Sequence, residues 1–318
     1  MRRKRFLTAI TLLLVAAIAI PITAYAAYYN TYTTVATLPN GNGCNRTQGF
    51  AIGSTYAYSA KCNDDNTKQV IYRTNQNDGS TTLMSNGDNS TTYTTYLGHA
   101  NDMDTCTIGD VYHLFVATMK SGSDSLVKMH YSGTTYYKDG GFQLKFNGSD
   151  IKISGVKKYS KDANYVYFLF YRYWDNEGGV SLYKGKVPLN ANSGVINVTH
   201  AFDINIKDAL VNGSKISNIE EYTKQGIGYI DGTDQLLIPL TYNNVSVVLV
   251  YNNASAATGT ITANSNLSFR ITSSAYPNLF EIEGCDEANG RLYFNCNRKE
   301  TSSDILHDAV CYFNGYTP

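Results

Sequence analysis

One short phrase occurs five times along the chain, and it constrains the fold more than any other feature. Each copy is a polar residue, usually followed by glycine, and then an apolar residue. The copies are Gln48-Gly49-Phe50, Asn101-Asp102-Met103, Ser154-Gly155-Val156, Gln225-Gly226-Ile227 and Glu283-Gly284-Cys285. Successive copies lie 53, 53, 71 and 58 residues apart, and a strand-like run follows each of them. A repeat of this length built from short strands is typical of β-propellers, with one blade per repeat.

The repeat therefore predicts an all-β, five-bladed β-propeller. Strict alternation over residues such as Tyr165 to Tyr171 supports the strand assignment. Six blades remain an alternative, because the long third interval leaves room for a degenerate blade near Val195 to Ile206. Within the same interval, Ile204 to Val211 is the segment that could form a short helix. Thr33 to Leu38 is predicted to add a strand to the last blade and close the ring, which removes exposed sheet edges.

The first 26 residues have the pattern of a secretory signal peptide. Arg2 to Arg5 form a basic segment, Phe6 to Ile20 is apolar, and Ala24-Tyr25-Ala26 fits a cleavage site. The apolar run is shorter than the roughly 20 residues of a spanning helix, and no later stretch is apolar enough to span. We therefore expect residues 1–26 to be removed and residues 27–318 to form one secreted domain. An uncleaved membrane anchor is the alternative.

Net charge argues against a nucleic-acid partner. The whole chain has 26 basic and 26 acidic residues. Four basic residues lie in the predicted signal peptide, which leaves 22 basic against 26 acidic residues and a net charge of −4 in the mature chain. Nucleic-acid binding needs a basic face, so this composition predicts no such partner. We expect a monomer.

Six cysteines follow the predicted cleavage site: Cys44, Cys62, Cys106, Cys285, Cys296 and Cys311. Export permits disulfides, but six cysteines allow fifteen pairings, and the sequence does not choose among them. Cys285 and Cys296 flank a turn signal at Asn289-Gly290 and could face each other across a hairpin. None of the spacings resembles a zinc site.

The repeated phrases predict two rings of polar side chains at the propeller axis, because residues two apart in a strand share a face. The first ring is Gln48, Asn101, Ser154, Gln225 and Glu283, and the second is Arg46, His99, Lys152, Thr223 and Glu281. We expect these residues to face a wet axial channel. The glycines after four of them would let inner strands crowd near the axis. The amides could also serve only to join neighbouring strands, and Arg46 could pair with Glu281 to close the ring.

The charged members of the rings suggest two kinds of chemistry. Asp102 and Glu283, with His99 nearby, could hold a calcium-like cation, although no cofactor is required. If the protein is an enzyme, a glycoside hydrolase using Asp102, Glu281 and Glu283 is the class these residues predict. The sequence contains no Gly-x-Ser-x-Gly, His-Glu-x-x-His or phosphate-binding loop, and the ring is mostly neutral amides. Catalysis therefore remains an open alternative.

Sugar binding accounts for more of the sequence. The chain has 27 tyrosines and a single tryptophan, Trp174, in the cluster Tyr171 to Asp175. Aromatic faces beside amides and hydroxyls suit sugar recognition, although most tyrosines will only pack between blades. The predicted ligand-binding residues are Gln48, His99, Asn101, Asp102, Ser154, Gln225, Glu283 and Trp174.

Three short motifs resemble a known family. Gln48-Gly49-Phe50-Ala51-Ile52-Gly53, Leu97-Gly98-His99-Ala100-Asn101-Asp102-Met103 and Gln225-Gly226 look like the helveticin J-type family of large secreted bacteriocins. Related propellers occur in teichoic-acid-associated proteins and in phage proteins that recognise the Gram-positive wall. The resemblance implies a secreted propeller that binds a cell-wall or surface glycopolymer, with bactericidal activity as a further implication. Only Gln48, His99, Asn101, Asp102 and Gln225 match the family phrases.

Two alternatives to glycopolymer binding stay open. One is an extracellular glycan-cleaving hydrolase that uses the channel carboxylates. The other is a protein-binding scaffold, which predicts an apolar patch on one face of the propeller.

Overall fold

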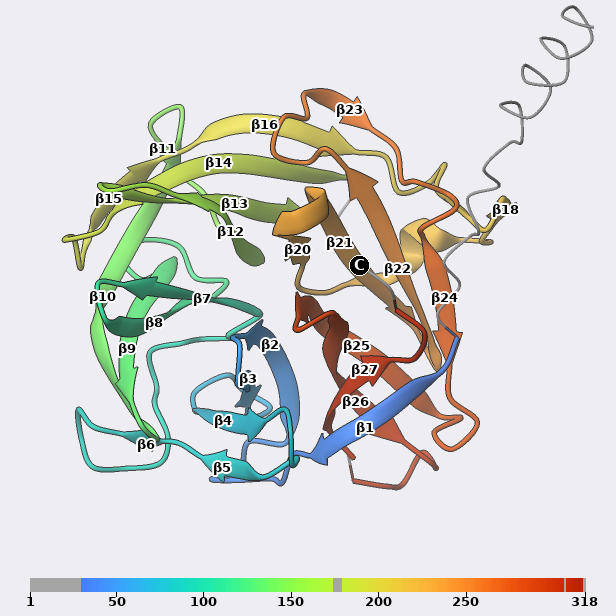
Figure 1. Cartoon of the computed structure of the whole chain (residues 1–318), viewed down its shortest axis with the longest axis horizontal. Helices are drawn as coiled ribbons and strands as arrows, with labels where there is room; N and C mark the ends of the chain where they lie inside the picture. Colours follow the sequence, from blue (N-terminus) through green and yellow to red (C-terminus); the bar gives the residue numbers. More distant parts are fainter. Residues whose placement is uncertain (1–29, 174–178, 306, 317–318) are drawn as a thin grey trace, which may run out of the picture.

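The computed structural model of the chain describes residues 30–173, 179–305 and 307–316. In this part of the chain, five sheets of four or more strands and one two-stranded hairpin account for the β-structure. Figure 1 shows the sheets arranged in a ring around a common axis. The propeller class predicted from the repeat is confirmed. Among the described residues, no helix is long and apolar enough to cross a membrane.

The first two sheets follow one another along the chain. The first has the order β2 (Arg46–Ile52), β3 (Tyr56–Cys62), β4 (Gln69–Asn75) and β5 (Thr81–Leu83). The second has β7 (Asp102–Ile108), β8 (Val111–Ala117), β9 (Leu126–Ser132), β10 (Thr135–Phe146) and β11 (Ser149–Asp150). Two short strands, β6 (Ser85–Asn86) and β15 (Gly194–Asn197), also pair with β10. The inner strands of these two sheets are β2 and β7. The first contains the first copy of the phrase, and the second begins at the second residue of the second copy.

The third and fourth sheets contain the long interval of the repeat. The third runs β12 (Gly155–Lys161), β13 (Tyr165–Tyr173), β14 (Val180–Pro188), β16 (Thr199–Ile204) and β23 (Gly259–Ile261). The fourth contains β19 (Thr223–Lys224), β20 (Gly228–Ile230), β21 (Gln235–Tyr242), β22 (Val245–Asn252) and β24 (Phe269–Thr272). Between them lie the hairpin of β17 (Leu210–Val211) and β18 (Ser214–Lys215), and the 3₁₀ turn η1 (Ile219–Glu221); η2 (Asp231–Thr233) precedes β21.

Two expectations for this interval are wrong. The predicted short helix over 204–211 is absent, because Ile204 ends β16 and Leu210–Val211 pairs with β18. Residues 195–206 do not form a blade of their own either. They extend the second and third sheets through β15 and β16, since their apolar side chains pack into the cores of those sheets.

The fifth sheet joins the two ends of the chain. Its order is β25 (Leu279–Ala288), β26 (Arg291–Lys299), β27 (Ala309–Phe313) and β1 (Tyr32–Thr37). β1 pairs antiparallel with β27, so the predicted closing strand is confirmed to within a residue at each end. The turn between β25 and β26 consists of Asn289 and Gly290, both with positive φ, as expected for an Asn-Gly hairpin.

The hydrophobic core is divided among the spaces between neighbouring sheets. Five clusters of buried apolar side chains each bridge one pair of neighbours, including the first and fifth sheets, where Phe50 and Val310 belong to one cluster. Between the second and third sheets, the rings of Phe115 and Phe168 have centroids 4.8 Å apart. Apolar contacts therefore join every pair of neighbouring sheets, and the polar groups are left at the axis.

Glycines allow the inner strands to meet at the axis, as predicted. A Cβ atom at Gly49 would lie 2.6 Å from the backbone oxygen of Ala100, and one at Gly284 would lie 2.9 Å from the Cβ of Phe50. Both distances are shorter than van der Waals contact permits. Because glycine has no side chain, the Gly49 N–H can donate to Ala100 O at 2.8 Å. This hydrogen bond links the first and second sheets.

Candidate functional site

A cavity of about 620 Å³ lies on the axis, where the inner strands begin. Most of the two predicted polar rings line it, namely Arg46, Gln48, His99, Asn101, Thr223, Gln225, Glu281 and Glu283. Apart from Leu279 and Ile305, all of its lining residues are polar or charged. We call this space the axial cavity.

Strand geometry explains why these side chains meet. Arg46 and Gln48 alternate with buried residues along β2, and Glu281 and Glu283 do the same along β25. A second strand adds a residue that the repeat did not predict: Asn297 of β26 lies opposite Glu281 in the register and also lines the cavity. Its sequence signal is the alternation of Asn295 and Asn297 with buried Cys296, a pattern that puts two amides on one face of a strand.

Glu281 and Glu283 form a carboxyl pair held by amides. Gln225 Nε2 donates to Glu281 Oε1 at 2.7 Å, and Asn297 Nδ2 donates to Glu283 Oε1 at 2.5 Å. Burial first, and then the charge of Glu281, raise the pKa of Glu283 well above its usual value. A hydrogen bond with Glu281 acts in the same direction on the pKa of Glu283. The arrangement puts two carboxyl groups side by side in the cavity wall.

Gln48 has a different environment. It is 5% exposed, and its Oε1 atom accepts no hydrogen bond from any described residue. Asn45 Oδ1, on the same cavity, is likewise a buried acceptor without a donor. A buried amide oxygen without a partner costs about 1–3 kcal/mol, so these two acceptors favour a ligand that carries donors.

Asp102 does not face the axial cavity, contrary to its predicted role in ligand binding, catalysis and metal binding. The side chain is fully buried, and backbone N–H groups of Met103 and Val156 donate to it at 2.9 Å. The Ile227 N–H donates at 3.3 Å, and Lys157 Nζ lies at the same distance. Three sheets therefore supply donors to one carboxylate, which leaves it a structural role.

The reason is visible in the repeated phrase itself. Asp102 stands where the other four copies have glycine, and its carboxyl group extends into the space that those glycines leave. A Cβ at Gly155 or Gly226 would lie 3.1 Å from an Asp102 carboxylate oxygen. Burial raises the pKa of Asp102 to about 7, although Lys157 and the N–H donors act in the opposite direction.

Lys157 completes this buried link. Its Nζ donates to Phe50 O at 2.9 Å and Met103 O at 2.6 Å, and it lies 3.5 Å from Asp286 Oδ2. Burial lowers the pKa of Lys157, but the neighbouring carboxylates of Asp102 and Asp286 outweigh this and raise it. A second cavity, of about 180 Å³, lies beyond the pair and is lined by Lys157, Asp104 and Asp286. It shares no lining residue with the axial cavity.

The remaining predicted site residues have mixed positions. Asn101 Nδ2 donates to Ser154 O at 2.6 Å, so this amide joins two sheets while it lines the cavity. Ser154 and Lys152, which precede β12, do not line it. Burial, Arg46 and Lys152 together lower the pKa of His99 and favour the neutral imidazole. Trp174 lies outside the described residues; its neighbour Tyr171 is fully buried.

The two carboxylates predicted to bind a cation lie in different surroundings. Asp102 accepts hydrogen bonds from backbone N–H groups and does not line the axial cavity, whereas Glu283 lines its wall. In the described part of the chain, no three His, Cys, Asp or Glu side chains gather as metal ligands.

Two pairings proposed from the sequence are wrong. Arg46 pairs with Asp64 at 3.0 Å rather than with Glu281, which instead accepts the Gln225 amide. Cys285 lies opposite Phe294 in the hairpin, and Cys296 lies opposite Ile282, with a β-bulge in between. The two cysteines therefore do not face each other across the hairpin. All six cysteines have free thiols. Ring closure is instead supported by a buried ion pair of Lys61 and Asp308, 2.8 Å apart, which the sequence did not indicate.

Comparison with known proteins gives fold-level likenesses only. No family model matches the chain. No curated protein matches it in sequence.

Several solved structures resemble the chain at low identity. The GH43_1 enzyme from Xanthomonas citri, complexed with xylose, has a TM-score of 0.48 and 7% identity over 89% of this chain and 90% of that one. A structure from the GH130 family of mannoside phosphorylases, which contains hydrolases of β-1,2 mannosidic linkages in Candida mannan, has a TM-score of 0.46 and 9% identity over 94% and 97%. The calcium-binding protein regucalcin from Agrobacterium tumefaciens has a TM-score of 0.36 and 11% identity over 91% and 95%.

Proposed function

We propose that this chain is a secreted, monomeric, five-bladed propeller that binds a cell-wall or surface glycopolymer in the axial cavity. Five sheets and five bridging core clusters support the blade count. The basic and apolar N-terminal segment supports secretion, and the helveticin J-like phrases support a target on the Gram-positive surface.

The observation that carries the proposal is the Gln48 amide. It is buried in the wall of a cavity large enough for more than one sugar ring, and its oxygen has no donor. Sugar hydroxyls donate and accept, so they can satisfy a free amide oxygen and its NH₂ group together. Asn45 offers a second acceptor nearby, and the carboxyl pair offers a third point of contact.

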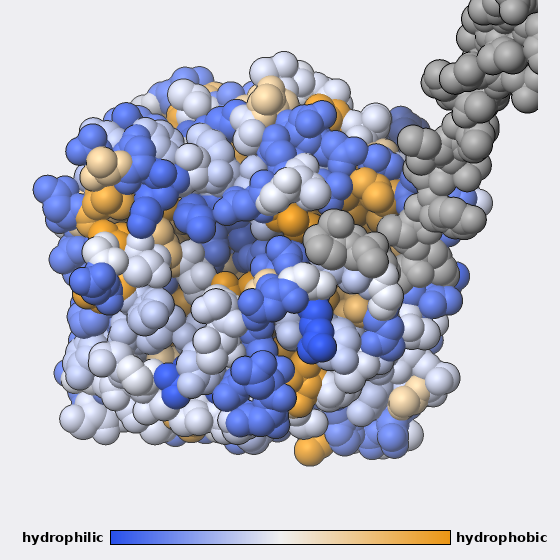
Figure 2. Space-filling model, viewed as in Figure 1, coloured by the Kyte–Doolittle hydropathy of each residue, from blue (hydrophilic) through white to orange (hydrophobic). Residues whose placement is uncertain are grey.

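The cavity is also suited to hydroxyl groups as a class. Amides from the first, second, fourth and fifth sheets line it, and Leu279 and Ile305 are the two apolar residues among those that do. A protein-binding surface would need a contiguous apolar patch. The face drawn in Figure 2 is predominantly hydrophilic, with hydrophobic residues in small scattered groups.

A binding experiment tests the proposal. Residues 27–318 would be incubated with intact Gram-positive cell walls, with and without teichoic acids, and with EDTA in parallel. We expect saturable binding that Gln48→Ala weakens about tenfold, because the free amide is lost. Gln235→Ala is the matched control, since Gln235 pairs with Asn252 away from the cavity and its loss should leave binding unchanged.

Either of two outcomes would contradict the proposal. Folded protein that does not bind any of these walls, or that binds equally well without Gln48, rules out the axial cavity as the site. Loss of binding in EDTA alone would add a cation to the proposal.

A glycan-cleaving hydrolase is the second candidate, and the Glu283 carboxyl supports it. A buried acid with a raised pKa can donate a proton to a leaving group. Glycosidases separate their two catalytic carboxyls by about 5–9.5 Å. The candidates for the second carboxyl are Glu281, Asp64 and Asp304, which also line the cavity. Release of reducing sugars from cell walls, abolished in Glu283→Gln, would favour this candidate.

A further inference from the structure

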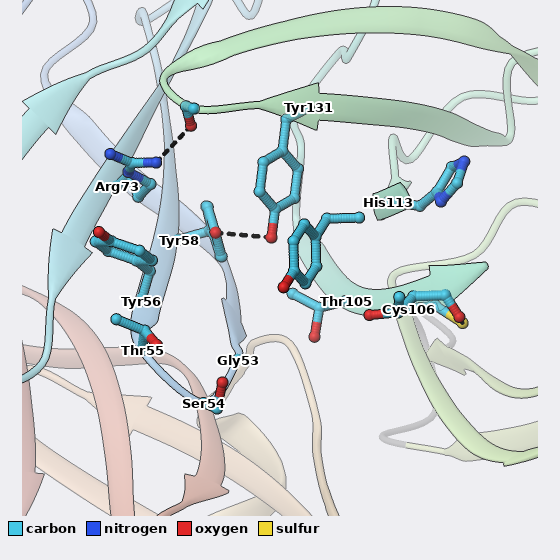
Figure 3. Close-up of a pocket in the computed structure, with 13 residues that line it drawn as sticks. Gly53, Ser54, Thr55, Tyr56, Tyr58, Arg73, Thr105, Cys106, His113 and Tyr131 are labelled. Atoms are coloured by element: carbon cyan, nitrogen blue, oxygen red, sulfur yellow. Dashed lines mark hydrogen bonds between the residues drawn. The ribbon is translucent and has the colours of Figure 1, made fainter. Parts of the chain in front are cut away.

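A separate cavity of about 240 Å³ lies between the first and second sheets, away from the axis. Figure 3 shows its wall, where Tyr56, Tyr58 and Arg73 from one sheet face Tyr131 and His113 from the other. None of its lining residues lines the axial cavity. We call it the inter-blade groove.

Aromatic side chains form one side of the groove and are held firmly. Tyr58 is 2% exposed and its hydroxyl donates to the Tyr131 hydroxyl at 2.7 Å. Tyr112 stacks on Tyr131 with ring centroids 5.6 Å apart and an angle of 18° between the planes. Tyr112 is nevertheless 57% exposed, so much of its ring is open to solvent. A stacked, exposed tyrosine beside fixed neighbours offers a preformed platform for a ligand ring.

Arg73 gives the groove its charge. Its guanidinium carbon lies 4.2 Å from the centroid of the Tyr56 ring, and NH1 donates to the backbone oxygen of Gly133. Among the described residues it has no carboxylate partner, although a guanidinium group has five N–H donors. The thirteen lining residues include no Asp or Glu. His113 adds little charge, because burial and Lys128 lower its pKa.

Hydroxyl groups complete the lining. Ser54, Thr55 and Thr107 are exposed at the rim. They are available to donate to or accept from hydroxyl groups of a ligand. The groove thus combines an aromatic platform, a positively charged fork and several hydroxyls within a volume smaller than the roughly 300 Å³ of a drug-sized pocket.

We propose that the inter-blade groove binds one sugar unit that carries an anionic group, either a carboxylate or a phosphate. The sugar ring lies against the tyrosines, the anionic group accepts N–H bonds from Arg73, and the threonine and serine hydroxyls contact the ring hydroxyls. Arg73 is preorganised for this role because the Tyr56 ring and Gly133 already fix its orientation. In a mature chain of net negative charge, this local cation selects anionic over neutral sugars.

Titration with three probes tests the proposal: glucuronate, glucose 6-phosphate and neutral glucose, each followed by calorimetry and ligand-observed NMR at low salt. We expect at least one anionic sugar to bind about tenfold or more tightly than glucose. Arg73→Gln should remove this preference, and Tyr112→Ala should weaken binding of the same sugar by about tenfold. Tyr112 is exposed, so its loss leaves the fold intact.

Two controls separate the groove from other effects. Arg291 also stacks on a tyrosine, 4.7 Å from the Tyr312 ring, but lies outside the groove, so Arg291→Gln should bind like the original protein. Gln235→Ala should also bind like the original protein, because Gln235 pairs with Asn252 and lines neither the groove nor the axial cavity. The proposal is overturned if neither anionic sugar binds, if glucose binds equally well, or if Arg73→Gln and Tyr112→Ala have no effect.

Discussion

Glu283 shows how a single buried carboxyl can set the pH dependence of stability. Its pKa is raised above the ordinary value of 4.5, so the folded state holds this proton more tightly than the unfolded chain does. The folded state is therefore favoured most at low pH, and that advantage is lost as the pH rises from about 4.5 through the folded pKa. Glutamine has the shape of the protonated acid and can still donate to Glu281.

We predict that Glu283→Gln is more stable than the original protein near neutral pH. The difference in free energy of unfolding between the two proteins should grow as the pH rises above about 4.5, because only the original protein then loses stability through Glu283, and it should vanish below that pH. Urea unfolding across this pH range measures it, and shifts from other groups cancel because both proteins share them. An equal pH dependence in the two proteins would show that Glu283 is ionised in the folded state.

At the scale of strands, Asp102 joins inner strands that belong to three different sheets. It begins β7, accepts the Val156 N–H of β12, and accepts the Ile227 N–H beside β20. Its loss leaves three buried N–H groups, those of Met103, Val156 and Ile227, and the buried Lys157 ammonium without this partner. Removing one member of a buried ion pair typically costs about 3–5 kcal/mol.

We predict that Asp102→Ala lowers the free energy of unfolding by that amount, measured by urea denaturation. Adding Lys157→Met should recover part of the loss, because the uncompensated charge is then gone. Arg46→Ala is the control, since the Arg46–Asp64 pair is exposed and should contribute no more than about 1 kcal/mol. A loss as small as the control's would mean that Asp102 is not the link described.

At the scale of the whole molecule, burial of the cysteines makes a chemical prediction. All six thiols are free and buried, and Cys296 and Cys311 lie on the paired strands β26 and β27. We expect a thiol reagent to label none of them in the folded protein and all six in guanidinium chloride. If fewer than six thiols are labelled in denaturant, a pair of cysteines is oxidised in the purified protein. Peptide mapping would then examine Cys296 and Cys311 first.

Much of the ring followed from the sequence because strand periodicity acts locally. Alternation in β2 and β25 correctly put Arg46 with Gln48, and Glu281 with Glu283, on the axial cavity. Asp102 could not be placed this way, because its surroundings are made by glycines and N–H groups more than fifty residues away in sequence. Lys152 and Ser154 do not line the cavity although they hold the same places in the repeat as His99 and Asn101, so the repeat alone did not decide which members reach it. The inter-blade groove was missed for a related reason: Tyr112 and Arg73 lie in ordinary strand positions, and only packing of two sheets brings them together.

The pairing of β1 with β27 has a consequence for how the molecule is made. The strand that completes the ring is synthesised early, and its partner is synthesised almost last. Throughout that interval β1 presents an unpaired edge, and so does the incomplete fifth sheet. Crowded chains at this stage can exchange β1, each closing the ring of its neighbour. We therefore expect dimers when the protein is overproduced rapidly and no dimers when it is expressed slowly.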